Sequence, residues 1–257
     1  MTLKKLKAYF ATTSALPQAE LEKWKEDPRE SVQRLVSSYE QQQKNLAAEK
    51  KRIEKLWSLE KNLQRQGVKL IAGIDEAGRG PLAGPVVAAA VVMPVGFMLP
   101  GLNDSKKLTA KKRATLQTTI RQHAISLGVG LVEADLIDEL NIWEATCLAM
   151  QKAISALTIN PEHLLIDAMP LPKVAIPQTN LIKGDQRSAS IAAASIIAKT
   201  TRDKYMEKLA NKYPAYAFEK HKGYGTLLHM KILAEIGPSP IHRQSFKPVS
   251  ALLNNAK

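Results

Sequence analysis

The chain has 257 residues and a single cysteine, and its 37 Lys and Arg against 24 Asp and Glu give a formal net charge of +13. This length is enough to bury a sizeable core in one large domain or two unequal ones. One cysteine excludes an internal disulfide and fits a reducing compartment, and no apolar run approaches the length of a membrane span. We therefore expect a cytoplasmic protein and exclude the disulfide-stapled and membrane-spanning classes.

The positive charge is concentrated toward the end of the chain. Residues 1–68 carry 14 basic and 9 acidic side chains, and residues 69–185 carry 11 of each. Residues 186–257 carry 12 basic against 4 acidic side chains and hold three of the five histidines. Such a localised positive field suits a polyanionic partner such as nucleic acid, although solvated lysine faces that serve solubility are also common.

Residues 1–67 are predicted to form a helical N-terminal extension, separate from a main domain over residues 68–257. Asp27 suits an N-cap with Glu30 reaching back to it, and no glycine or proline interrupts the chain from there to Gln66. Apolar residues recur at every seventh position, but the companion positions are too polar for a coiled coil. We expect an amphipathic helix that docks on the main domain or on a partner.

The most informative segment runs from Leu70 to Val87. An apolar run, predicted to be a buried strand, ends in the adjacent carboxylates of Asp75 and Glu76, and a glycine-rich bend leads into a second apolar run. Ionised carboxylates at the end of a buried strand are costly unless positive charge meets them, and a metal ion is the usual solution. A tight hairpin with a solvated acidic tip is the alternative.

Two phosphate-binding motifs fail in this segment. A P-loop requires Lys and then Ser or Thr after its second glycine, where this chain has Arg79 and Gly80. A dinucleotide-binding fingerprint fails because the third glycine comes one residue late. What remains is a strand end that can hold metal, followed by a loop whose backbone can touch a ligand.

The rest of the chain predicts alternating strands and helices. The second apolar run, residues 86–93, is expected to pair antiparallel with the first strand. The other expected elements are a strand over residues 128–133 and helices over residues 109–126, 141–157, 188–212 and 227–236, the first capped by Thr109 and the third by Ser188 or Ser190.

Two more apolar runs also end in an aspartate, Asp167 and Asp185. Open α/β sheets place their sites outside the carboxyl ends of the strands, so parallel neighbours would bring these acids to Asp75 and Glu76. Four converging carboxylates would repel one another unless divalent cations neutralise them, and an all-oxygen ligand set favours Mg²⁺ or Mn²⁺ over zinc. Each acid alone could be a structural cap, but the repeated pattern favours a two-metal site.

Six segments of the chain form a distinctive series, in the order Asp75-Glu76-Ala77-Gly78-Arg79-Gly80-Pro81, Asn103-Asp104-Ser105-Lys106-Lys107-Leu108, Ile166-Asp167, Lys183-Gly184-Asp185, Ala192-Ala193-Ala194-Ser195-Ile196 and His221-Lys222-Gly223-Tyr224. Taken together, these motifs resemble the ribonuclease HII family over roughly residues 68–245. The related ribonuclease HIII family has Lys or Thr in place of Arg79 and lacks the Pro-Leu-Ala-Gly continuation. The resemblance implies an α/β, ribonuclease-H-like fold: a mixed five-stranded sheet flanked by helices, with a helical N-terminal extension and a helical C-terminal part.

The resemblance also implies an activity and a set of site residues. The activity is metal-dependent endonucleolytic cleavage of the RNA strand of RNA–DNA hybrids, with incision 5′ of ribonucleotides embedded in duplex DNA, leaving 5′-phosphate and 3′-hydroxyl ends by a two-metal mechanism. Two Mg²⁺ or Mn²⁺ ions would be held by Asp75, Glu76, Asp167 and Asp185. The ribose 2′-hydroxyl would be sensed by Gly78, Arg79 and Gly80, and Tyr224 would pack on the sugar beyond the RNA-to-DNA junction.

Several basic side chains are candidate phosphate contacts that set position rather than sequence, although each could be an ordinary surface residue. These residues are Lys106, Lys107, Lys183, Arg187 and Lys222, with His221 as a further candidate. We expect a monomer that binds hybrids and ribonucleotide-containing duplex DNA.

Two competing functions remain open at this point. One is a two-metal nuclease or strand-transfer enzyme that acts on DNA, and the other is a non-catalytic basic nucleic-acid-binding protein whose acids are structural. The first would cleave an all-DNA duplex, which a loop that senses the 2′-hydroxyl should refuse.

Overall fold

The computed structural model describes residues 1–13 and 16–255, and the chain divides into two compact units, residues 1–52 and 53–257. The first unit is helical, with α1 (Leu3–Thr12), α2 (Gln18–Lys25) and most of α3 (Glu30–Leu56). Its small core is apolar and includes Leu6, Phe10, Leu21, Val32, Val36 and Tyr39.

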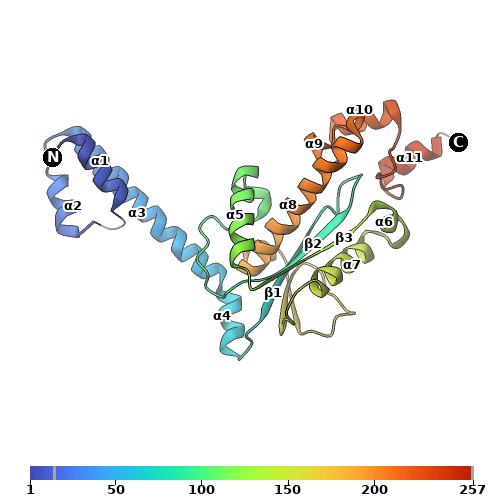
Figure 1. The fold of residues 1–257 in the computed structure, drawn as a ribbon, viewed down its shortest axis with the longest axis horizontal. Helices are drawn as coiled ribbons and strands as arrows, with labels where there is room; N and C mark the ends of the chain where they lie inside the picture. The colour runs from blue at the N-terminus through green and yellow to red at the C-terminus, as the bar shows by residue number, and fades with distance from the viewer. Residues whose placement is uncertain (14–15, 256–257) are drawn as a thin grey trace. The chain divides into compact units, whose positions relative to one another are not determined.

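The second unit is built on a mixed five-stranded sheet (Figure 1), as predicted. The strands are β1 (Ile71–Ala77), β2 (Val86–Val92), β3 (Ser126–Val132), β4 (His163–Asp167) and β5 (Gln178–Leu181), in the spatial order β3-β2-β1-β4-β5. β2 pairs antiparallel with both β1 and β3, whereas β4 pairs parallel with β1 and β5. The parallel pairing of the first and fourth strands brings two acid-bearing strand ends to the same edge.

The helices of the second unit cover both faces of this sheet. They are α4 (Ser58–Arg65), α5 (Ala110–His123), α6 (Ala134–Leu140), α7 (Ile142–Ser155), α8 (Ala189–Lys212), α9 (Phe218–His221), α10 (Leu227–Ile236) and α11 (Lys247–Asn255). Thr109 and Ser188 cap α5 and α8 as predicted, each accepting a main-chain N–H three residues on. No helix in the described part of the chain is both long enough and apolar enough to cross a bilayer.

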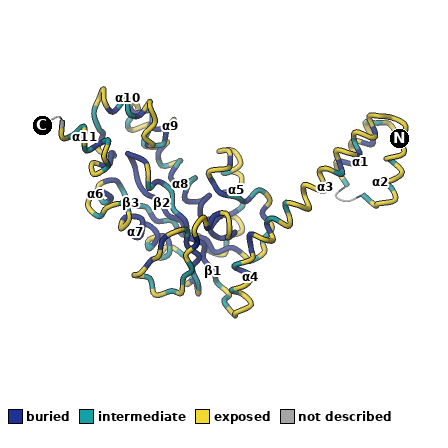
Figure 2. The backbone as a smooth tube through the Cα atoms, turned by 180° about the vertical axis from the view of Figure 1, so that it is seen from behind, coloured by how far each residue is buried: buried dark blue, intermediate teal, exposed yellow. Residues whose placement is uncertain are grey.

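The alternation of side chains along β2 divides the core into two layers. Ala89 and Val91 pack with α5 and α8 on one face, and Ala88 and Ala90 pack with α7 on the other. β1 and β2 are buried through their central residues (Figure 2), as is β4, whereas the edge strands β3 and β5 are buried only in part. On β1, a side chain at Gly73 would collide with the main chain of Ser190 at 2.0 Å, so this glycine lets α8 lie directly on the sheet.

The long predicted helix differs from the structure at both ends. It starts at Glu30, because Asp27 accepts the N–H of Arg29 in a turn instead of capping the helix. It breaks at Trp57, whose indole is buried and donates a hydrogen bond to the carbonyl of Phe97 at 3.0 Å. Burial of this aromatic ring stabilises a break that the helix-forming sequence around it does not predict. The helices α6 and α11 were likewise not predicted.

Candidate active site

The four predicted acids lie at one edge of the sheet. Asp75 and Glu76 are near the end of β1, Asp167 is the last residue of β4, and Asp185 lies in the 3₁₀ turn over Gly184–Gln186. Asp75 and Asp167 directly follow the paired residues Ile74 and Ile166 on neighbouring parallel strands. The structure therefore brings the predicted acids together, as the repeated strand ends indicated.

Burial and neighbouring negative charge make Asp75 and Asp185 hard to ionise. Burial raises the pKa of Asp75 well above its usual range, and the charges of Glu76 and Asp167 raise it further. Burial also raises the pKa of Asp185 to about 6, with the charges of Asp104 and Asp167 adding to the effect. The pKa shifts of Asp75 and Asp185 therefore show that neighbouring negative charges lie close to both groups and are incompletely balanced by the protein.

The protein itself engages only some of the carboxylate oxygens. Asp75 accepts the N–H of Glu76 at 2.7 Å and a hydrogen bond from the hydroxyl of Ser195. Asp167 accepts the N–H of Gly184 at 2.7 Å. Burial raises the pKa of Glu76. The positive charge of Arg79, which lies 3.5 Å from Oε1 of Glu76, offsets part of that rise. Oε2 of Glu76 is buried without a hydrogen-bond partner among the described residues.

The donor set suits a hard divalent cation. Within the described residues, no three carboxylate, imidazole or thiol groups already lie close enough together to hold a metal ion. However, every candidate ligand at this edge is a carboxylate oxygen, and a buried oxygen of Glu76 has no hydrogen-bond partner in the described part of the chain. Oxygen-only sites of this kind favour Mg²⁺ or Mn²⁺, so the residues present fit such a group.

A fifth acid, Asp104, joins the group from a loop that follows β2. It caps the 3₁₀ turn over Ser105–Lys107 by accepting the N–H of Lys106 at 2.8 Å, and its carboxyl group hydrogen-bonds that of Asp185. The hydroxyls of Ser105 and Ser195 lie 2.9 Å apart and fix this loop to α8. Sequence reasoning quoted this segment as a motif but gave Asp104 no role; an acid two residues before a pair of lysines was the available signal.

Two fully buried arginines hold the glycine-rich loop that follows the acids. Arg243 donates to the carbonyls of Gly78, Arg79 and Gly84, at 2.6 to 3.0 Å. Arg202 donates to the carbonyls of Pro85 and Ala83 and to that of Lys222. Sequence reasoning missed both arginines, because nothing local distinguishes them from the other basic residues of the C-terminal part.

The two glycines of the Gly-Arg-Gly segment serve different purposes. Gly78 has φ +97°, and a Cβ there would lie 2.1 Å from Nε of Arg202. It therefore provides both a left-handed conformation and room for the arginine. Gly80 has no neighbour within 4 Å of a Cβ position, so its backbone faces open space. The Arg79 side chain is partly exposed beside it.

Tyr224 is an exposed aromatic residue that lies beside two cations. Its ring centroid lies 5.7 Å from Nζ of Lys199 and 5.8 Å from the guanidinium carbon of Arg202. Because Arg202 also packs against Gly78, the tyrosine and the glycine-rich loop flank the same buried guanidinium. An exposed ring beside two cations is suited to contact a sugar on a phosphate backbone.

The predicted phosphate contacts differ in their surroundings. Lys106, Lys107, Lys183 and Arg187 are exposed. Lys222 is half-buried, and its ammonium group pairs with Glu207 at 2.8 Å and donates to the carbonyl of Glu219. His221 is buried. The exposed four have the accessibility that a phosphate contact requires.

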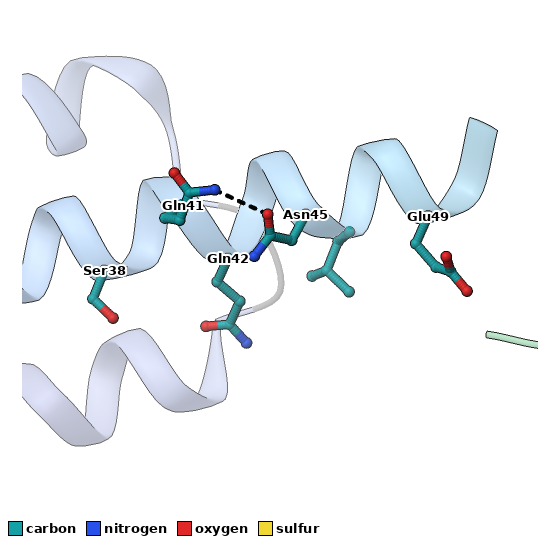
Figure 3. Close-up of a pocket in the computed structure, with 6 residues that line it drawn as sticks. Ser38, Gln41, Gln42, Asn45 and Glu49 are labelled. Carbon is teal, nitrogen blue, oxygen red and sulfur yellow. Dashed lines mark hydrogen bonds between the residues drawn. The ribbon is translucent and has the colours of Figure 1, made fainter. Parts of the chain in front are cut away.

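A surface pocket in the N-terminal unit has a different character. It is lined along α3 by Ser38, Gln41, Gln42, Asn45, Leu46 and Glu49 (Figure 3). Gln41 donates a hydrogen bond to the side chain of Asn45 at 2.9 Å, and Glu49 pairs with Arg52. Amides and one paired acid do not supply the groups of a hydrolytic site, so the acid cluster is the candidate active site.

Comparisons with known proteins agree with this site and fold. A model of "Ribonuclease HII" matches residues 72–249, and one of "Ribonuclease HII N-terminal domain" matches residues 2–64. The chain is 50% identical to a ribonuclease HII of Bacillus licheniformis over 98% of both chains. It is 53% identical to that of Geobacillus kaustophilus over 89% of this chain and 88% of the relative.

A solved structure shows the same fold. The crystal structure of ribonuclease H2 from Pyrococcus horikoshii matches with a TM-score of 0.63 and 28% identity, over 73% of this chain and 98% of that one. The family model covers most of the chain, and relatives of about 50% identity match it over nearly its full length. Both findings point to the same family. The chain belongs to the ribonuclease HII family and is an endonuclease with ribonuclease H activity on RNA–DNA hybrids.

Proposed function

We propose that this protein hydrolyses RNA in hybrids and incises on the 5′ side of single ribonucleotides in duplex DNA, with two divalent cations, Mg²⁺ or Mn²⁺. The ions would be held by Asp75, Glu76, Asp167 and Asp185. The observation that carries this proposal is the convergence of acids at the ends of β1 and β4, with one buried oxygen of Glu76 unpartnered among the described residues. The products would be a 5′-phosphate and a 3′-hydroxyl.

The chain's own residues preorganise this cluster. When bound, divalent cations supply the Lewis-acid chemistry that activates water and stabilises the leaving oxygen in phosphodiester hydrolysis. Ser195 and the N–H of Glu76 orient Asp75, and the N–H of Gly184 orients Asp167. These contacts hold the two side chains in place, which reduces the reorganisation needed when a cation binds.

The discrimination of RNA from DNA is assigned to the Gly-Arg-Gly loop. A 2′-hydroxyl both donates and accepts hydrogen bonds, and main-chain groups of Gly78 and Gly80 can meet both requirements. Open space at Gly80 gives the sugar access, and the Arg79 guanidinium can hold an adjacent phosphate. The buried guanidinium of Arg243 fixes the loop from behind by its bonds to the carbonyls of Gly78 and Arg79.

The remaining roles follow from position in the chain and exposure. Tyr224 would pack on the sugar beyond the RNA-to-DNA junction, and the exposed lysines and Arg187 would contact phosphates. We assign residues 1–67 to an extension and residues 68–257 to the catalytic domain. The monomeric state and the cytoplasmic location stay predictions, and size-exclusion chromatography with light scattering tests the first.

The test is incubation of duplex DNA that carries one ribonucleotide with the native chain and Mg²⁺ or Mn²⁺. We expect incision on the 5′ side of the ribonucleotide, an all-DNA duplex left intact, and no incision by Asp75→Asn. Asp135→Asn, on the exposed surface of α6, is the matched control and should cleave normally. Cleavage of the all-DNA duplex would favour a DNA nuclease instead, and full activity of Asp75→Asn would refute the assignment of the acids.

A further inference from the structure

Three buried histidines surround the main chain of the loop that carries Tyr224. His221 is 6% exposed, His229 0% and His242 1%. The rings of His221 and His229 stack with centroids 4.2 Å apart, and the Nε2 atoms of His229 and His242 lie 2.9 Å apart. Nothing in the hydrolysis described above uses these side chains, yet burying three ionisable rings side by side is costly unless each is neutral and fully hydrogen-bonded.

The hydrogen bonds of His229 have one possible direction. Its Nδ1 lies 2.9 Å from the carbonyl oxygen of Tyr224. A carbonyl only accepts, so Nδ1 carries the proton and donates. In a neutral ring, Nε2 of His229 then carries a lone pair and can only accept a hydrogen bond. It must therefore accept a hydrogen bond from the Nε2–H group of His242.

The hydrogen bonds of His242, at the other end of this series, fix the same direction independently. The N–H of Ser239 donates to Nδ1 of His242 at 2.9 Å, and the Ser239 hydroxyl, which can also donate, lies 2.8 Å from the same nitrogen. The Ser239 carbonyl oxygen is farther away, at 3.3 Å. Because an N–H can only donate, Nδ1 of His242 carries the lone pair and its Nε2 carries the proton. A directed series results, from the Ser239 N–H to His242, from His242 to His229, and from His229 to the Tyr224 carbonyl. Two separate main-chain contacts, at opposite ends, require the same pair of tautomers.

The third histidine holds the same loop from its other side. His221 donates from Nε2 to the carbonyl of Tyr216 at 2.9 Å, and its Nδ1 accepts the N–H of Gly223 at 3.2 Å. Burial lowers the pKa of all three rings, and that of His242 to about 4, where the charge of His229 adds to the effect. All three are therefore neutral at pH 7, as the hydrogen-bond directions require.

The loop held in this way is conformationally unusual. Lys222 has φ +50° and Gly223 φ +86°, and a Cβ at Gly223 would lie 2.5 Å from the carbonyl oxygen of Ala83. The N–H of Leu82 donates to the carbonyl of Gly223 at 2.8 Å. The main chain before Tyr224 is thus strained and pinned, while the ring itself is 42% exposed.

We propose that His229 and His242 are positioning residues for Tyr224. Their directed hydrogen bonds fix the Tyr224 carbonyl and so present the aromatic ring to the nucleic-acid sugar in one orientation. This inference rests on the proposed role of Tyr224 in substrate binding. A ring held in advance loses less conformational entropy when the sugar packs on it, so disruption should weaken binding more than the chemical step.

The first test reads the tautomers directly and does not depend on activity. In the ¹⁵N-labelled native protein at pH 7, two-bond nitrogen–proton spectra should show His229 as the Nδ1–H tautomer and His221 and His242 as the Nε2–H tautomers. Assignment comes from single His→Asn variants. An Nε2–H tautomer or an imidazolium at His229 would overturn the inference, because neither permits the directed series.

The second test measures cleavage of duplex DNA with one ribonucleotide. His229→Ala should raise KM about tenfold, the effect of losing one well-placed hydrogen bond, with kcat changed by less than about threefold. His229→Asn should retain most of the native KM, because its amide nitrogen stands where Nδ1 stands. His123→Ala, at an exposed histidine on α5, is the control and should behave as native.

A double-mutant cycle separates positioning from general damage to the fold. In a Tyr224→Ala background the additional effect of His229→Ala on KM should fall to less than about twofold, because the ring it positions is gone. An unchanged tenfold effect in that background would show a merely structural role and overturn the inference. So would a Tyr224→Ala variant with native KM. Failure of the native protein to cleave would instead refute the proposed function and leave the tautomer result standing.

Discussion

Arg243 offers the sharpest test of how the glycine-rich loop is held. Its side chain is fully buried, and its guanidinium makes four hydrogen bonds to three main-chain carbonyls, those of Gly78, Arg79 and Gly84. We consider Arg243→Met, which keeps the length of the side chain and removes every donor. Arg243→Lys keeps the charge but cannot reproduce the planar fork.

The structure sets the size of the expected effect. Each carbonyl left buried without a donor costs about 1–3 kcal/mol, and removal of a desolvated guanidinium returns part of that sum. We therefore expect Arg243→Met to lower the free energy of unfolding by about 3 kcal/mol, a large part of the about 5–15 kcal/mol typical of a domain. Arg243→Lys should lose less than Arg243→Met, because one ammonium can still donate to more than one of these carbonyls.

The assay combines urea unfolding with cleavage kinetics at a temperature where every variant is folded. Arg243→Met should lower kcat/KM on duplex DNA with one ribonucleotide by at least about tenfold, because the loop proposed to contact the 2′-hydroxyl loses its support. Arg121→Met, at an exposed arginine on α5, is the matched control. Stability within about 0.5 kcal/mol of the native value, together with unchanged kcat/KM, would refute this account of the loop.

Three further predictions concern the acids and the helical segment before the sheet. Burial raises the pKa of Asp185 to about 6, so without divalent cations the folded protein should lose up to about 3 kcal/mol of stability as pH rises from about 4 to 6. Asp185→Asn should flatten that dependence in urea unfolding at several pH values; an equally steep curve would contradict the shift. Burial also raises the pKa of Glu60, which is 0% exposed and accepts hydrogen bonds from Ser188 Oγ at 2.6 Å and from the Ser190 N–H at 3.0 Å. The protonated form of Glu60 stabilises the fold below about pH 4.5, and that contribution is lost as pH rises, so the stability of Glu60→Gln should depend less on pH than that of the native protein. At pH 8, Glu60→Gln should be more stable than Glu60→Ala by about 1–3 kcal/mol, because it keeps the buried contacts. Equal stabilities of the two variants would count against those contacts. Finally, deletion of residues 1–67 should lower the free energy of unfolding by at least about 3 kcal/mol more than deletion of residues 1–52, because it also removes the buried side chains of Trp57 and Glu60. Equal melting temperatures of the two truncated proteins would contradict this expectation.

The sequence alone determined the features that depend on local patterns. Apolar runs that end in Asp75 and Asp167 predicted the ends of β1 and β4, and small residues after Ser188 predicted a helix lying close to the sheet. The third run does not end as predicted, because β5 stops at Leu181 and Asp185 lies in the 3₁₀ turn that follows. These signals are local because strand burial and helix capping are decided by residues only a few positions apart. The motifs that follow from them identified the family, and the comparisons confirmed it.

Only the tertiary structure decided which distant groups meet. Asp104 reaches Asp185, Arg243 reaches the carbonyls of the Gly-Arg-Gly loop, and His242 reaches His229 in the series that ends on Tyr224. Each of these contacts joins loops or helices whose own sequences do not specify which other segment they pack against. The periodicity of a strand or helix sets which face a residue occupies, but the packing of that face against another element sets its partner. That is why the acids at the strand ends could be predicted from the sequence, and the buried arginines and histidines that support the loops around them could not.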